Sequence, residues 1–149
     1  MKPESSPITD DEYLLRRVHR DRFRSDRAPG VSPNAFEPRV KGRDPDADGI
    51  SLYREACVAD ATDILATIPE DKRSEYAIVR VPVALLKGLE LTARSVPDDR
   101  IPGHVVIPEL NAADYEADKT RFTPVKLALA TAASGDDAVL QRPASLQTD

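Results

Sequence analysis

The sequence contains one cysteine, Cys57, among 149 residues, and this excludes a disulfide framework. It has no apolar run close to the roughly 18 residues that a membrane-spanning helix needs. The first six residues, Met-Lys-Pro-Glu-Ser-Ser, are polar where a signal peptide would be apolar. From these absences we expect a soluble cytoplasmic protein that does not act at a membrane.

The motifs of well-defined enzyme classes are also absent. The six glycines are scattered, so the chain has no glycine-rich loop of the kind that holds a phosphate group. It has no serine nucleophile elbow, and its two histidines and one distant cysteine do not have the spacing of a zinc site. The sequence therefore predicts no cofactor, and it favours a binding or accessory module over an enzyme.

Length and composition indicate one globular domain, since 40% of the residues are hydrophobic and 32% are charged. A chain of this size buries about 68–70% of the surface of its unfolded form, so its core needs neither disulfides nor a metal. The polar residues 1–9 and the mixed, aperiodic residues 135–149 are predicted to be disordered tails. They flank a single predicted domain at residues 10–134.

Apolar periodicity predicts an α+β fold, with a small mixed sheet of four or five strands and two or three helices. The strands are expected at 13–19, 49–54, 76–81, 89–93 and 104–107. A helix capped by Asp10 stays an alternative for the first strand.

The predicted helices are an amphipathic one at 57–68, a short one at 82–87, and a last one from Ala112 to Ala133 that is interrupted near Pro124. Residues 28–49 hold four prolines and three glycines. We therefore expect a long loop there, with at most one helical turn at 32–36.

Charge is unevenly distributed along the chain. The net charge is -5, yet residues 14–27 contain six arginines, two aspartates and one histidine. Guanidinium groups match phosphates and carboxylates in two-point contacts, so this Arg-rich segment predicts recognition of a protein partner or a small anionic ligand. A solvated face paired with the acidic remainder of the domain is the alternative. Duplex DNA is not favoured as a partner, because the isoelectric point is near 5.1.

The residues best suited to chemistry are cationic or titratable and lie on or beside predicted strands. His19 and His104 are the candidate catalytic groups, because imidazole can act as an acid or a base near neutral pH. Arg16, Arg17 and Arg54 are candidate anion ligands. Each histidine also has a purely structural interpretation. In it, His104 forms a hydrogen bond with a loop carbonyl, and His19 extends the arginine-rich face. Together these residues define a second possible function, a small enzyme that acts on a nucleotide or another phosphate-bearing substrate.

One stretch matches the spacing of a calcium-binding loop. Asp44, Asp46, Asp48 and Glu55 are placed with Gly49 as in D-x-D-x-D-G-x5-E, where alternating carboxylates enclose a hard cation. The helix that should enter such a loop would have to cross Pro38 and Gly42. A solvated acidic turn is therefore the favoured interpretation, and calcium is a minority hypothesis.

Four short motifs resemble those of a group of small uncharacterised bacterial proteins. The matching segments are Arg16-Arg17-Val-His19, Ser32-Pro-Asn-Ala35-Phe36-Glu-Pro38, the Ser51 strand with Leu52 and Arg54, and Gly103-His104 before Val106-Ile107. The resemblance extends over residues 13–108 and implies no activity. It implies that residues 40–48 lie in a stretch of variable length between two motifs.

The chain also resembles ADP-ribosyltransferase-like domains in the order of three residues. These domains place Arg or His on a first strand, Ser or Tyr on a second and Glu on a later one. The sequence offers Arg16 or His19, then Ser51 or Tyr53, then Glu109 in that order. The resemblance implies a nicotinamide dinucleotide site, and it adds Ser51 to the candidate ligand-binding residues.

Overall fold

The structure is a computed structural model that describes residues 1–24, 26–42 and 45–144. Its centre is a six-stranded sheet with the order β4-β5-β2-β1-β3-β6, in which every pairing of described strands is antiparallel. The strands are β1 (Tyr13–His19), β2 (Ile50–Arg54), β3 (Tyr76–Pro82), β4 (Arg94–Ser95), β5 (His104–Ile107) and β6 (Val139–Gln141). The α+β class is confirmed. The sheet has six strands rather than four or five, and it is antiparallel rather than mixed.

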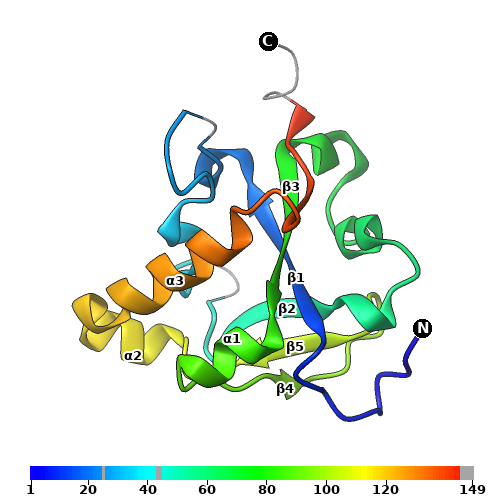
Figure 1. The fold of residues 1–149 in the computed structure, drawn as a ribbon, viewed down its shortest axis with the longest axis horizontal. Coiled ribbons are helices and arrows are strands. Elements are labelled where there is room, and N and C mark those ends of the chain that lie inside the picture. Colours follow the sequence, from blue (N-terminus) through cyan, green and yellow to red (C-terminus); the bar gives the residue numbers. More distant parts are fainter. Residues whose placement is uncertain (25, 43–44, 145–149) are drawn as a thin grey trace.

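Helices lie on both sides of this sheet (Figure 1). The α-helices are α1 (Val83–Gly88), α2 (Ala112–Ala117) and α3 (Thr123–Ala133). Short 3-10 helices are η1 (Arg20–Arg22), η2 (Pro33–Phe36), η3 (Glu55–Cys57), η4 (Ala61–Leu65), η5 (Glu70–Glu75) and η6 (Lys119–Phe122). In Figure 1, α2 and α3 lie on one side of β1 and β3, and residues 55–75 lie on the other. None of the described helices has the length and apolar character needed to cross a membrane.

Two apolar clusters cover the two faces of the sheet. Successive side chains of a strand point to opposite faces, and β1 follows this rule. Leu14 joins the larger cluster, which includes Leu129 of α3. Leu15 joins the smaller one, with Tyr53 and Ile64. The neighbouring residues Leu14 and Leu15 therefore pack into different layers of the fold.

Gly49 fixes the start of β2 beside β5. Its φ is +117°, a backbone conformation that favours glycine. A Cβ atom at this position would overlap the carbonyl oxygen of Ile107. Only glycine lets the two strands approach here, and the strand that begins at Ile50 carries Ser51 to the region described below.

Two predicted elements are wrong. Residues 57–68 form no α-helix, because Asp60 caps a new turn: its side chain accepts from Thr62 N, and Asp63 accepts from Asp60 N. Val58, Ile64 and Leu65 of this segment are still buried. Residues 89–93 form no strand either, since Leu91 N still donates to Leu86 O and Glu90 has a φ of 60°. The strand of this region is β4, slightly later in the chain.

The last helix of the sequence prediction is two helices. Asn111 caps α2, as expected, by accepting a hydrogen bond from Asp114 N. The break comes at Asp118, and Pro124 lies in the first turn of α3, where a missing N–H costs nothing. Beyond α3, the structure places Val139–Gln141 at the sheet edge as β6, although composition alone indicates a disordered tail.

Candidate functional site

The candidate site lies where β1 and β2 separate. β3 pairs with β1 along its whole length, from Tyr13 to His19. In the described chain, β2 pairs with β1 at Leu14 and Leu15 and not beyond. Figure 1 shows β1 rising away from β2 after this contact. The separation opens a cleft of about 440 Å³ between the later half of β1, the beginning of β2 and the segment around η2.

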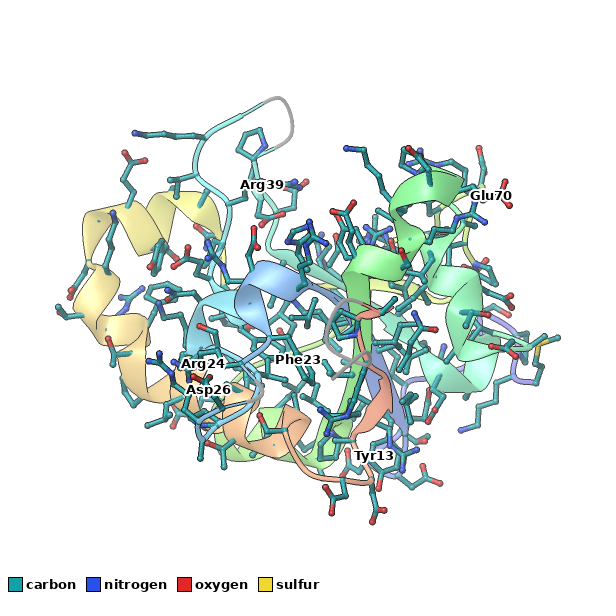
Figure 2. The ribbon with its side chains drawn as sticks, turned by 90° about the horizontal axis from the view of Figure 1, so that it is seen from above. Tyr13, Phe23, Arg24, Asp26, Arg39 and Glu70 are labelled. Carbon is teal, nitrogen blue, oxygen red and sulfur yellow. The ribbon has the colours of Figure 1, made fainter. Side chains whose placement is uncertain are left out.

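The cleft is lined mainly by polar and charged side chains. Its cationic or titratable residues are Arg16, Arg17, His19, Arg22 and Arg39, its carboxylates are Glu37 and Asp46, and its neutral polar residues are Asn34, Ser51 and Tyr76. Figure 2 shows Arg39 on the loop at one side of this region and Glu70, on η5, at the other. The structure thus brings four of the predicted site residues to one place: Arg16, Arg17, His19 and Ser51.

Arg16 bridges the separated strands. Its Nε donates to the carbonyl of Ala35 at 2.8 Å, and its Nη1 donates to the carbonyl of Ser51 at 2.7 Å. The guanidinium carbon lies 5.6 Å from the centre of the Phe36 ring. Burial lowers the pKa of Arg16 to about 10, against the opposing effect of Asp46. The group is therefore still cationic at neutral pH, and its Nη2 has no hydrogen-bond partner among the described residues.

Arg17 lies on the opposite face of β1 and is held from two sides. Its Nη1 donates to the hydroxyl of Thr67 at 2.7 Å and to the carbonyl of Ile64 at 3.2 Å. Its guanidinium lies 5.6 Å from the centre of the Tyr53 ring. All these partners are uncharged, so they position the cation without neutralising it.

The two carboxylates of the cleft have cationic partners of their own. Asp46 accepts from the backbone N–H of Arg39 at 2.7 Å and lies 3.8 Å from its guanidinium. Glu37 accepts from the Tyr115 hydroxyl at 2.8 Å and lies 3.5 Å from the buried Nζ of Lys126. Both carboxylates thus have a cationic partner, although Asp46 also raises the pKa of Arg16, and these two carboxylates stand against four arginines that line the cleft.

Three arginines of the cleft are left without an acidic partner. Among residues 1–24, 26–42 and 45–144, no carboxylate lies within 4.0 Å of the side-chain nitrogens of Arg16, Arg17 or Arg22. Arg22, on η1, is exposed. The cleft consequently carries an excess of positive charge on a protein whose net charge is -5.

His19 is held between two carboxylates. Its Nδ1 accepts from the backbone N–H of Asp21 at 3.2 Å, so in the neutral ring the proton is on Nε2, which donates to Glu75 at 3.1 Å. The bond from His19 lowers the pKa of Glu75. Both ring nitrogens of His19 are thus occupied by groups of the protein.

His104 lies on β5, next to the cleft, and bonds Ser51 across the strands. Its Nδ1 is 2.8 Å from the carbonyl oxygen of Val96, which can only accept, so Nδ1 carries the proton in the neutral ring. Its Nε2 then accepts from the hydroxyl of Ser51 at 2.9 Å. The loop-carbonyl bond considered for His104 is present, and it leaves the other nitrogen for Ser51.

Arg54, predicted as an anion ligand, lies away from the cleft and bonds other parts of the protein. Its side chain is completely buried, and its donors bond both oxygens of Glu12 at 2.8 and 2.9 Å. The remaining donors reach Glu4, Ser6 and Pro7 of the N-terminal segment. The Glu12 bond raises the pKa of Arg54. Arg54 anchors the N-terminal segment and has no donor left for a ligand.

The calcium hypothesis gains no support from the described residues. Asp44 lies outside them, Asp46 bonds Arg39, and Glu55 pairs with Arg80 at 3.1 Å. Asp48 is exposed. Within the described part of the chain, no three His, Cys, Asp or Glu side chains are grouped so that they could hold a metal ion. Cys57 is buried, and this burial raises the pKa of its thiol.

Only part of the residue set that resembles ADP-ribosyltransferase-like domains lies at the cleft. Arg16, His19 and Ser51 line it, but Glu109 does not. The Glu109 carboxylate instead accepts from the backbone N–H of Thr92 at 2.9 Å and from its hydroxyl at 2.7 Å. The Glu109 carboxylate is therefore not brought to Arg16 and Ser51.

Several residues of the cleft were not singled out from the sequence. Asn34 belongs to the Ser-Pro-Asn-Ala-Phe turn, whose Ser32 hydroxyl accepts from Asn34 N, so the turn itself is a local signal. Arg39 and Asp46 lie in the long loop, and Tyr76 begins β3. Nothing local indicates that these residues line one cleft with Arg16, because their approach depends on the pairing of distant strands.

Comparisons of this chain with protein-family models, with curated proteins and with solved structures found no match. The fold and the cleft are therefore the basis for assigning a function.

Proposed function

We propose that the cleft between β1 and β2 binds a small phosphate-bearing molecule and that the protein is a binding module for it. The observation that carries this proposal is the excess of cationic side chains in the cleft. Arg16, Arg17 and Arg22 have no carboxylate partner among the described residues, whereas Glu37 and Asp46 are already paired. A bound anion would supply the missing charge.

Phosphate fits the donors that the cleft offers. Guanidinium groups bond phosphate oxygens in planar two-point contacts, and bonds between charged groups are about twice as strong as neutral ones. Arg16 Nη2 has no hydrogen-bond partner among the described residues, and the same holds for the whole guanidinium group of Arg22. The volume of about 440 Å³ lies within the range of roughly 300–1,000 Å³ that is usual for small-molecule sites.

The remainder of the molecule favours a small ligand over nucleic acid. The net charge of -5 repels a long polyanion outside the cleft, while the local excess of arginine attracts a compact one. A protein partner would use the same donors through an acidic segment, so peptide binding is a separate outcome of the test.

A thermal-shift series tests this proposal. Pyrophosphate, ADP, citrate and an acidic peptide are added separately to the wild-type protein, to Arg22→Gln and to Arg94→Gln. Arg94 is exposed on β4, outside the cleft, so its variant makes the same change of charge elsewhere. A ligand at 100 times its Kd stabilises the folded state by about 2.7 kcal/mol, which raises the midpoint by several degrees.

The expected result is a shift with pyrophosphate and ADP that is reduced in Arg22→Gln and retained in Arg94→Gln. A shift with the acidic peptide alone would replace the small ligand by a protein partner. No shift with any phosphate compound, or equal losses in the two variants, would overturn the proposal.

A second function, catalysis on the bound ligand, is favoured by one observation. The hydroxyl of Ser51, in the wall of the cleft, is hydrogen-bonded to the imidazole of His104.

A further inference from the structure

Ser51 and His104 have the arrangement of a nucleophile and its base. The Ser51 hydroxyl lies 2.9 Å from His104 Nε2, and the carbonyl of Val96 holds His104 Nδ1 at 2.8 Å. This third group fixes the ring so that, in its neutral form, Nε2 is the nitrogen without a proton. A nucleophile, a base within hydrogen-bond reach and a group that orients the base are the three parts of an activated hydroxyl.

The packing around the pair restricts the imidazole further. The ring of Tyr53 lies 5.3 Å from that of His104, centre to centre, on the same face of the sheet. Tyr53 is also the ring over which Arg17 lies. His104 is therefore held by a hydrogen bond at one nitrogen and by an aromatic neighbour.

Two arginines of the cleft lie near Ser51, one at its backbone and one on the face of its side chain. Arg16 donates to the carbonyl of Ser51 itself at 2.7 Å. Leu15 pairs with Tyr53, and strands alternate, so Arg17 and Ser51 lie on the same face of the sheet. A phosphate group bonded to Arg17 would lie on the face of the sheet that carries the Ser51 hydroxyl, with positive charge near its outer oxygens.

We propose that Ser51 is a catalytic nucleophile and His104 its general base in the hydrolysis of a phosphate ester bound in the cleft. This inference rests on the proposed function, because the arginines must first hold the phosphate. It goes beyond that function by assigning a reaction and two catalytic residues.

The reaction has two steps. Ser51 Oγ bonds to phosphorus, its proton passes to His104 Nε2, and the ester oxygen leaves and takes that proton as the alcohol. Water then attacks the phosphorus of the phosphoserine, gives a proton to His104, and releases inorganic phosphate while Ser51 regains its proton. The net change is one ester and one water converted to one alcohol and one phosphate, with no oxidation.

Two readouts on the full-length protein test this inference. The first is covalent labelling by a fluorophosphonate probe, in which Ser51 Oγ bonds to phosphorus and fluoride leaves. The second is release of p-nitrophenol from p-nitrophenyl phosphate. The variants are Ser51→Ala, His104→Gln and, as the matched control, Ser74→Ala, since Ser74 is an exposed serine on η5 outside the cleft.

The expected result is one adduct, located at Ser51, in the wild-type protein and in Ser74→Ala. We expect no adduct in Ser51→Ala and at least a 100-fold slower reaction in His104→Gln, with p-nitrophenol release lost in both. An absence of adduct in the wild-type protein, or equal labelling of His104→Gln, would overturn the inference. Labelling without release of p-nitrophenol would overturn the hydrolytic step.

A parallel thermal shift with pyrophosphate separates this inference from the proposed function. If the wild-type protein binds pyrophosphate but is neither labelled nor active, the catalytic inference fails and the binding function stands. If pyrophosphate also has no effect, both fail.

Discussion

Arg54 and the arginines of the cleft are the same residue type in opposite environments. Arg54 is completely buried, and its donors are bonded to Glu12 and to the N-terminal segment. Arg16, Arg17 and Arg22 line a cleft, and none of them has a described carboxylate within 4.0 Å. An arginine with all its donors bonded inside the protein stabilises the fold. An arginine with a free donor and no acidic partner is available to a ligand.

The largest effect is expected at the buried pair. Glu12→Ala removes the carboxylate that bonds Arg54 and leaves a buried cation uncompensated, so the free energy of unfolding should fall by about 3–5 kcal/mol. Urea denaturation measures this loss. The control is Asp10→Asn, whose exposed ion pair with Lys87 should change the stability by about 1 kcal/mol or less. A loss of that small size in Glu12→Ala would show that Arg54 is not the anchor described here.

The pH dependence of stability should also come from this pair. Burial alone would raise the pKa of Glu12, but the bonds from Arg54 and from Thr9 N outweigh it and lower the pKa from 4.5 to about 2. A carboxyl with a lowered pKa stabilises the fold above its unfolded pKa, and this contribution, about 3 kcal/mol, is lost as the pH falls from 4.5 to about 2.

Urea denaturation of the wild-type protein and of Glu12→Ala across this pH range tests whether the stabilisation by Glu12 is lost as the pH falls. The difference in stability between the two proteins should narrow towards low pH. A difference in stability that is constant between neutral pH and pH 2 would contradict the lowered pKa of Glu12.

A substitution in the cleft should have the opposite effect to Glu12→Ala: ligand binding changes, and the stability of the fold changes little. Arg22→Gln removes an exposed cation without a described partner, so the free energy of unfolding should stay within about 0.5 kcal/mol of the wild-type value. The affinity for pyrophosphate should fall about 10-fold, which corresponds to about 1.4 kcal/mol. Calorimetric titration measures this, and an unchanged Kd would place the ligand elsewhere.

The smallest expected effect is that of salt. It should distinguish the cleft, which solvent reaches, from the buried pair of Arg54 and Glu12. Raising the ionic strength from about 0.05 to 0.5 M should weaken pyrophosphate binding several-fold, because the charges of the cleft are reached by solvent ions. The same change should alter the stability difference between the wild-type protein and Glu12→Ala by less than about 0.5 kcal/mol. Equal sensitivity of both quantities would contradict the burial of the Arg54 pair.

Part of this structure could be predicted from local sequence, because short apolar runs and turn residues are local signals. The strands at 13–19 and 104–107, and the turn at 32–36, are where apolar spacing and turn residues indicate them. The helix predicted at 57–68 fails because its apolar spacing fits a series of 3-10 turns equally well, and Asp60 begins a new turn.

The environment of each arginine could not be predicted in this way. Arg54 is buried because residues 2–12, distant in sequence, fold over it. Arg16 lines a cleft because β2 leaves β1 after Leu15. Both facts depend on long-range pairing, so sequence reasoning groups Arg54 with Arg16 and Arg17, although only the latter two line the cleft.

The most direct test follows the arginine side chains themselves. In proton–nitrogen NMR spectra, the side-chain Nε–H signals of Arg16, Arg17, Arg22 and Arg54 are recorded while pyrophosphate is added to the wild-type protein. We predict that the signals of the three cleft arginines shift in a saturable manner and that the signal of Arg54 does not move. A shift of Arg54 as large as theirs, or no shift of the cleft arginines, would contradict the division of the arginines into a structural anchor and a ligand site.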